Sequence, residues 1–237
     1  MFEIIRNQER GLTKTGWLDS HHSFSFGGYY NTSRINFGTL RVINEDTVAP
    51  GKGFGRHEHD NMEIVTIVLS GAVEHEDSMG NKGVIQAGQV QRMSAGSGIT
   101  HSEYNASTSE PVHFLQIWVF PRDRDMTPSY EQASFTKEQL ANKLYPIVAS
   151  EPKPGSIQIH QDARFFLGHM DIGRQWTQQL TSLKHGAYLF VIKGTLSFED
   201  KELKAGDAVQ ISQQSQVQFK ALEPSDVLLI EVALTVL

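Results

Sequence analysis

Two segments of this chain, more than a hundred residues apart, follow the same pattern. Ile67-Val68-Leu69-Ser70-Gly71 resembles Phe190-Val191-Ile192-Lys193-Gly194 at an offset of 123 residues, and Ala87-Gly88 resembles Ala205-Gly206 at an offset of 118. Short apolar runs that end in glycine are typical of β-strands joined by turns. A pattern that occurs twice indicates two copies of one structural unit. We therefore expect an all-β chain built from two similar modules, with a hairpin five residues shorter in the second.

A polar segment separates the two copies. Residues 121–128 begin and end with proline and carry Arg, Asp and Thr between them, which interrupts the strand pattern. We place the boundary there, with a first domain at 1–130 and a second at 131–237. Directly after it, a capping hydroxyl at Ser134 and leucines at 140 and 144 predict one short helix near the linker.

The first copy carries two clusters of polar side chains that the second lacks. His57, His59 and Glu63 are separated by even numbers of residues, so a β-strand would direct all three side chains to one face. His101, Glu103 and Asn105 are related in the same way about forty residues later. Imidazole nitrogens and carboxylate oxygens from two neighbouring strands form a ligand set that suits a divalent transition metal.

A lone histidine on a strand is more often structural than a metal ligand. Here the apolar strand 64–69 directly follows the first cluster, which places the cluster on a rigid scaffold. The repeat adds a second argument, because the two offsets place no metal-binding side chain in the second copy at any of these positions. His57, His59 and Glu63 align with Leu180, Ser182 and Gly186, and His101 and Glu103 align with Phe219 and Ala221.

Other histidines are interpreted as structural. His21 and His22 are adjacent, so on a strand they point to opposite faces, and we favour a structural role for both. They precede residues 23–26, whose Ser-Phe-Ser-Phe alternation predicts a half-buried strand. We expect a solvated side chain at His75, which lies among acidic residues before a turn, and a packed strand residue at His113.

Composition narrows the classes of partner. The 21 basic and 27 acidic residues give a net charge of −6 without a run of like charge, which argues against direct binding of nucleic acid. No cysteine is present, so disulfides and thiolate ligands are excluded. The N-terminal residues do not follow the pattern of a signal peptide, and no run of some eighteen apolar residues occurs. We expect a soluble, cytoplasmic monomer that does not contact a membrane.

The motifs around the two clusters resemble those of a known family. The spacings Gly-x5-His-x-His-x3-Glu and Gly-x2-His-x3-Asn are similar to the two cupin motifs, although one residue more than usual separates Glu63 from Gly71. The longer motifs resemble the pirin family of bicupins, and the strong matches cover about the first 120 residues. These motifs are Gly16-Trp-Leu-Asp-Ser-His-His-Ser-Phe-Ser-Phe-Gly, Arg41-Val-Ile-Asn-Glu-Asp, Gly53-Phe-Gly-x-His-x-His-x-x-Met-Glu and Ser94-Ala-Gly-Ser-Gly-Ile-x-His-Ser-Glu-Tyr-Asn.

This resemblance implies two cupin-type β-barrels packed face to face, with one metal ion in the N-terminal barrel. The family's ligands fall on His57, His59, His101 and Glu103 of this sequence. Glu63, which common cupins use, would then be a neighbouring carboxylate or a strand residue. Spacing alone does not separate the two glutamates. The family's metal is usually iron, so Fe(II) is expected, while the ligand types also suit Ni, Mn, Cu and Zn.

Members of the family that this sequence resembles show quercetin dioxygenase activity. The resemblance therefore implies an enzyme that opens the heterocyclic ring of a flavonol with O2 and releases CO. Four ligands leave about two positions on a six-coordinate metal, and Glu103 could act catalytically by accepting a proton from the substrate. Two alternatives stay open: an iron- and redox-dependent regulatory protein that binds a transcription-related partner, with flavonol oxidation incidental, and an enzyme for another small molecule.

Overall fold

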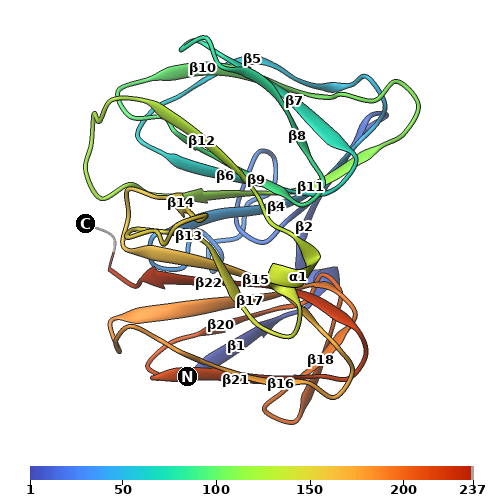
Figure 1. Ribbon diagram of the computed structural model, residues 1–237, viewed down its shortest axis with the longest axis vertical. Coiled ribbons are helices and arrows are strands. Elements are labelled where there is room, and N and C mark those ends of the chain that lie inside the picture. The colour runs from blue at the N-terminus through green and yellow to red at the C-terminus, as the bar shows by residue number, and fades with distance from the viewer. Residues whose placement is uncertain (236–237) are drawn as a thin grey trace.

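The computed structural model describes residues 1–235 and consists of two β-barrels stacked along the long axis of the molecule (Figure 1). Each barrel has a seven-stranded sheet and a four-stranded sheet. The two large sheets face each other across the middle of the molecule, and the small sheets form its two ends. The prediction of an all-β chain with two barrels packed face to face is confirmed.

The N-terminal barrel contains eleven strands. Its large sheet has the order β12 (Ser129–Ser134), β9 (Gln89–Ser94), β6 (Glu63–Ser70), β11 (Val112–Val119), β4 (Leu40–Val48), β3 (Leu18–His22) and β2 (Gly11–Lys14). Its small sheet has the order β5 (Gly53–His59), β10 (Ile99–Asn105), β7 (Ala72–Asp77) and β8 (Lys82–Gln86).

The C-terminal barrel repeats this arrangement. Its large sheet has the order β1 (Phe2–Ile5), β20 (Ala208–Ile211), β17 (His185–Lys193), β22 (Ser225–Ala233), β15 (Ala163–Met170), β13 (Tyr145–Ala149) and β14 (Ile157–Gln158). Its small sheet has the order β16 (Gln175–Gln179), β21 (Gln216–Ala221), β18 (Thr195–Phe198) and β19 (Lys201–Lys204).

The turn glycines confirm the internal repeat. Gly71 and Gly194, which directly follow β6 and β17, have φ angles of 76° and 85°, and Gly88 and Gly206 have 82° and 83°. These values lie in the left-handed region that residues with a Cβ rarely adopt. Matching glycines therefore fix matching turns, and the strands that follow them occupy equivalent positions in the two barrels.

Two edge strands do not follow the predicted domain boundary. β1 pairs with β20, so the first residues of the chain complete the large sheet of the C-terminal barrel. β12 pairs with β9 and occupies the equivalent edge in the N-terminal barrel. The division into domains at 1–130 and 131–237 stays a prediction, and sheet membership departs from it at both of these edge strands.

Two local predictions needed correction. The short helix α1 (Lys137–Leu140) forms, but its cap is Thr136, whose hydroxyl accepts the amide of Gln139, because Ser134 still belongs to β12. The predicted strand at 23–26 is wrong, since β3 ends at His22 and Phe24 lies fully buried in the connection that follows. Among residues 1–235, no helix has the length and apolar character needed to cross a membrane.

The largest apolar core lies between the two barrels rather than inside the N-terminal one. Large side chains from both large sheets meet there, including Ile43, Leu115, Phe165, Tyr188 and Phe190. A second core fills the C-terminal barrel, whereas the apolar clusters of the N-terminal barrel are small. The interior of the N-terminal barrel is therefore the place where polar side chains collect.

Candidate metal centre

Three histidines converge on the small sheet of the N-terminal barrel. β5 and β10 are antiparallel neighbours with His57 opposite His101, and strand alternation directs His59 to the same face as His57. One ring nitrogen from each of the three lies within 4.8 Å of the corresponding atoms of the other two. The register of two strands thus brings together side chains more than forty residues apart in the sequence.

Glu103 lies two residues beyond His101 on the inner side of this cluster. Its carboxylate accepts hydrogen bonds from the Gln116 amide at 2.6 Å and from the Thr66 hydroxyl at 3.4 Å. A carboxylate oxygen also lies within 4.8 Å of ring nitrogens of His101 and His75, which form a second triad with it. The structure thus places the four expected ligands in two overlapping groups that share His101.

The lowered pKa values of His59 and His101 suit metal binding. Burial, with the neighbouring imidazoles as the next cause, lowers the pKa of His101 to about 3 and of His59 to about 4. Neutral imidazole presents a lone pair to a metal ion, whereas imidazolium does not. His57 is oriented by its Nδ1–H, which donates to the Gly55 carbonyl at 2.7 Å and leaves Nε2 for the cluster.

The buried ring nitrogens of His101 test whether the residues present fit a metal ion. Both are closed off from solvent and have no hydrogen-bond partner among the described residues. An unpartnered buried polar atom costs free energy, and a metal ion bound by a ring nitrogen would remove that cost for the nitrogen that binds it. The donor set of imidazole and carboxylate also fits a divalent transition metal. The residues present therefore fit the expected metal.

Glu63 does not join the cluster. A turn at residues 60–62, with Asn61 at a φ of 44°, separates β5 from β6, so the parity argument that grouped Glu63 with His57 and His59 is wrong. Its buried carboxylate instead accepts the backbone amide of His160 at 3.1 Å, which ties the N-terminal barrel to the second half of the chain. Parity holds only within a single continuous strand.

Asn105 has a structural role, although it shares a face with His101 and Glu103. Its side-chain amide donates to the carbonyls of Val48 at 3.0 Å and Glu110 at 2.8 Å, which joins the end of β10 to two neighbouring segments. Alternation alone therefore did not distinguish the ligand candidates on this strand from a residue that connects the backbone.

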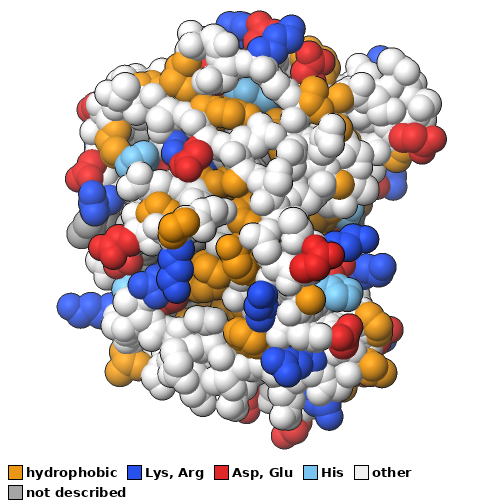
Figure 2. Space-filling view, viewed as in Figure 1, with side chains coloured by type: hydrophobic (Ala, Val, Ile, Leu, Met, Phe, Trp, Pro, Cys, Tyr) orange, Lys and Arg blue, Asp and Glu red, His pale blue; other side chains and the backbone are white. Residues whose placement is uncertain are grey.

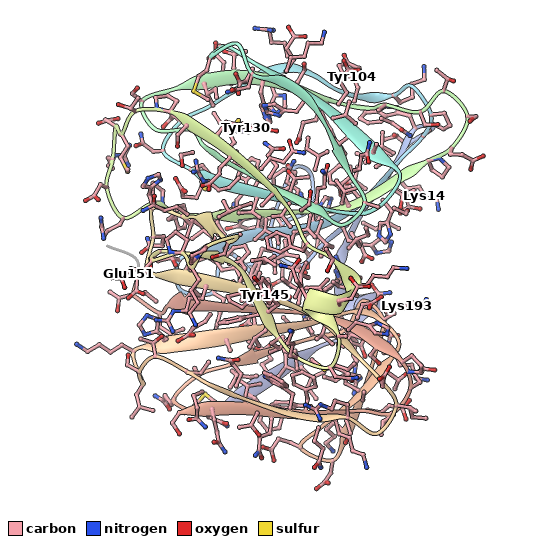
Figure 3. The ribbon with its side chains drawn as sticks, viewed as in Figure 1. Lys14, Tyr104, Tyr130, Tyr145, Glu151 and Lys193 are labelled. Atoms are coloured by element: carbon pink, nitrogen blue, oxygen red, sulfur yellow. The ribbon has the colours of Figure 1, made fainter. Side chains whose placement is uncertain are left out.

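His75 is buried beside the cluster, and the prediction of a solvated side chain is wrong. Its ring centroid lies 5.4 Å from that of His101 and 5.0 Å from that of Tyr130, which is labelled on β12 in Figure 3. Its Nε2 is 3.2 Å from Asp77. Strand β7 continues to Asp77, so alternation directs Val73, His75 and Asp77 inward, and that alternation was readable in the sequence.

His21, His22 and His113 make the structural contacts expected of them, but His22 also lines the cavity. His22 is buried and bridges Asn44 and Thr13, with both distances at 2.8 Å, while also lining the cavity next to the cluster. His21 is part-exposed and lies 3.3 Å from Asp19. His113 contacts Glu45 at 3.0 Å on the outer part of β11.

A cavity of about 530 Å³ opens beside the three histidines. Aromatic rings form much of its wall: Trp118 packs edge-on against His59 at 4.8 Å and against Phe26 at 5.3 Å. Trp17 packs on Phe54 at 5.3 Å and also lines the cavity. Its polar wall includes Asn44, Asp46, Gln116 and Glu103. A flat aromatic molecule would therefore meet rings on its faces and polar groups at its edge.

The structure shifts the alignment of the two barrels by two residues from the sequence offsets. Val73 and Leu196, equivalent positions two residues after the turn glycines, pair with Asn105 and Ala221 respectively, so Ala221 corresponds to Asn105 and not to Glu103. The corrected counterparts of His57, His59, His101 and Glu103 are Gln178, Leu180, Val217 and Phe219. Both candidate metal groups found among residues 1–235 lie in the N-terminal barrel.

Two stacked barrels, of which one holds an imidazole and carboxylate cluster, define this chain as a two-barrel cupin. Comparison with protein families agrees, since residues 5–119 match the model described as "Pirin" and residues 146–232 match "Quercetinase C-terminal cupin domain". A protein of Escherichia coli K12 named quercetin 2,3-dioxygenase is 39% identical over 231 residues, which covers 98% of each chain. The chain belongs to the pirin family.

Solved structures support the same relationship. The bacterial pirin YhhW of Escherichia coli in complex with nickel(II) matches with a TM-score of 0.94 at 37% identity and covers all of both chains. The protein YhaK of Escherichia coli matches with a TM-score of 0.74 at 28% identity, covering 90% of this chain and 92% of its own. A divalent metal in a pirin of this similarity is consistent with the donor set described above.

Proposed function

We propose that this protein is a metal-dependent dioxygenase that opens the heterocyclic ring of flavonols such as quercetin. The observation that carries the proposal is the convergence of His57, His59 and His101 beside Glu103 at the wall of an aromatic cavity. The name of its full-length relative, quercetin 2,3-dioxygenase, supports the substrate class. In the balanced reaction both atoms of O2 enter the ring-opened ester, and one carbon of the substrate leaves as CO.

We assign the metal to His57, His59, His101 and Glu103. A divalent metal bound there, with Fe(II) expected and Ni, Mn, Cu or Zn also compatible, would acidify a coordinated enol hydroxyl and bring it together with O2. Glu103 would accept the proton. The hydrogen bonds that its carboxylate receives from Gln116 and Thr66 support this role because they hold it beside the histidines.

The cavity wall supplies binding and orientation. Trp118 and Phe26 would pack against the flat rings of the substrate, and their apolar surfaces would exclude water from the reacting oxygens. Trp118 also donates its indole N–H to Gln116 at 3.3 Å, and Gln116 in turn donates to Glu103. A substrate packed on the indole would therefore sit next to the network that positions the proposed base.

Oxygen uptake with quercetin tests the proposal. We expect His101→Ala and Glu103→Ala to reduce uptake by about a thousandfold, because the loss of a metal ligand or of the base removes transition-state stabilisation. His169→Ala is the matched control, since this half-exposed histidine pairs with Asp226 in the C-terminal barrel. Uptake at the wild-type rate by metal-free protein would rule out the proposal.

The regulatory alternative predicts a different result. A protein that binds a transcription-related partner according to the oxidation state of its metal would retain that partner as the Fe(II) form, lose it on oxidation, and consume no oxygen with flavonols. A pull-down with both oxidation states, run beside the oxygen electrode, separates the two functions.

A further inference from the structure

Asp46 is a buried carboxyl in the cavity wall that the proposed metal chemistry does not use. It lies on β4, is 3% exposed, and lines the same cavity as His57, His59 and Glu103. The Ser20 hydroxyl donates a short hydrogen bond to its Oδ1. Within residues 1–235 no Lys, Arg or His nitrogen lies within ion-pair distance of it, and no protein group donates to its Oδ2.

Such a carboxyl is costly to the fold. Burial, with the charge of Glu103 as a further contribution and the Ser20 hydrogen bond in opposition, raises the pKa of Asp46 to about 7. Burying a polar group without full hydrogen bonding is unfavourable, and residues of this kind collect at functional sites. A role in binding would account for its retention inside the barrel.

The barrel architecture itself does not require a carboxyl there. Asp46 pairs with Phe114, which pairs with Val68 on the next strand. The equivalent row of the C-terminal barrel runs from Gly168 through Val227 to Val191. A glycine therefore suffices at this position of the same fold, so packing alone does not explain Asp46.

A neighbouring amide extends the polar wall. The Oδ1 of Asn44 accepts the ring N–H of His22 at 2.8 Å, which directs the amide group of Asn44 away from His22. Asn44 also lines the cavity, and its amide finds no acceptor among residues 1–235. A carboxyl oxygen and an amide N–H thus face the cavity from one strand, and together they could accept from and donate to a hydroxyl group.

We propose that Asp46, positioned by Ser20, is a second anchor for the substrate, accepting a hydrogen bond from a phenolic hydroxyl distant from the oxygens that bind the metal. This inference rests on the proposed function and adds how the site selects among flavonols. The pocket selects polyhydroxylated aromatic compounds over analogues that keep only the metal-binding oxygens. A site built to bond a hydroxyl discriminates strongly against a ligand that lacks it, because its buried polar groups are then left unpaired.

Calorimetric titration of the nickel-loaded protein without O2 tests the inference independently of turnover. The probes are quercetin and 3-hydroxyflavone, which share the metal-binding hydroxyl and ketone, while only quercetin carries further hydroxyls. We expect wild-type protein to bind quercetin more than tenfold more tightly. Asp46→Ala should weaken quercetin binding about tenfold and leave 3-hydroxyflavone within twofold, because one buried hydrogen bond is lost.

Two further variants complete the design. Ser20→Ala keeps the carboxyl but removes its orientation, and we expect quercetin affinity to fall about threefold. Asp19→Asn is the matched control, because Asp19 is a neighbouring acid that pairs with Lys14 outside the cavity, and both affinities should remain at the wild-type values.

The outcomes separate this inference from the proposed function. An equal effect of Asp46→Ala on both flavonols, or no effect on either, would overturn the role of Asp46 even if oxygen uptake is normal. Loss of the preference in Asp46→Ala without oxygen uptake in wild type would support the anchor and reject the dioxygenase. Wild-type protein that binds neither flavonol, or binds both equally, would overturn the inference.

Discussion

The two barrels have the same strands in the same order and opposite interiors. A row of side chains across the large sheet shows the difference, because directly paired residues on neighbouring strands share one face. In the N-terminal barrel this row consists of Asn44, Gln116, Thr66, Gln91 and Gln132. In the C-terminal barrel it consists of Phe166, Leu229, Leu189, Val209 and Ile4.

The small sheets differ in the same way. The three histidines and Glu103 correspond in the second barrel to Gln178, Leu180, Val217 and Phe219, and His75 corresponds to Phe198. The C-terminal interior is a packed apolar core, whereas the N-terminal interior contains the cluster of imidazoles and amides. Among residues 1–235, buried side-chain atoms without partners occur in Gln91, His75 and His101 of the N-terminal barrel and in Trp176 and Glu231 of the C-terminal barrel. One fold thus supports both a core that stabilises and a cavity that binds. The polar residues of the cavity replace apolar packing, so the binding role reduces the stability of that barrel.

Transferring residues from the second barrel to the first should have the largest effect. The double variant His101→Val and Glu103→Phe gives the N-terminal site its C-terminal counterparts, so we expect it to fold and to lose its metal, with affinity reduced at least a thousandfold through the loss of two ligands. Elemental analysis and metal titration measure this. Metal content equal to wild type would show that the cluster does not hold the ion.

The reverse transfer should damage the fold. Phe219→Glu places a carboxylate in the apolar core of the C-terminal barrel, and we expect the free energy of unfolding to fall by about 4 kcal/mol through lost packing and the burial of an unpaired charge. Denaturant unfolding measures the change. Lys220→Glu, at the exposed neighbouring position, is the control. A variant at position 219 as stable as wild type would mean that this barrel tolerates polar residues as the first does.

Replacing Gln116 with its counterpart tests how much a residue that hydrogen-bonds to a proposed metal ligand contributes to metal binding. Gln116→Leu removes the 2.6 Å hydrogen bond to Glu103 and copies Leu229 of the other barrel. Partners that orient a metal ligand typically contribute 10- to 100-fold in affinity or activity. We expect a loss of that size in metal affinity with the fold intact, and an unchanged affinity would show that Glu103 needs no such support.

Asp46 should make stability depend on pH in a way that its glycine counterpart does not. Because its folded pKa of about 7 is raised above the usual value of 3.8, the native state binds more protons than the unfolded state between these values, and the free energy of unfolding falls as pH rises through that window. In metal-free protein, Asp46→Asn should therefore gain about 2 kcal/mol relative to wild type between pH 5 and pH 7. Urea unfolding at each pH measures this. A free energy of unfolding that changes equally with pH in both proteins would contradict the prediction.

The sequence predicted what depends on local pattern. Repeated turn glycines revealed the two barrels, and strand alternation with two histidine segments located the cluster. The exchange of β1 into the second barrel, the separation of Glu63 by a turn, and the polar row of Gln116 and Gln91 were not foreseen, because they depend on which strands pair and in what register. The sequence offsets also slipped by two residues at the histidine segments, since the five-residue difference in the hairpin was readable from the glycines but the further two-residue gaps were not readable without strand pairing.

Anomalous X-ray diffraction from nickel-loaded crystals, recorded at the nickel absorption edge, tests the central claim most directly. One barrel should hold the ion and the other should not. We predict a single site in the N-terminal barrel, bound by His57, His59, His101 and Glu103 at about 2.0–2.2 Å. A peak in the C-terminal barrel, or an ion in the N-terminal barrel that these four residues do not bind, would contradict the account.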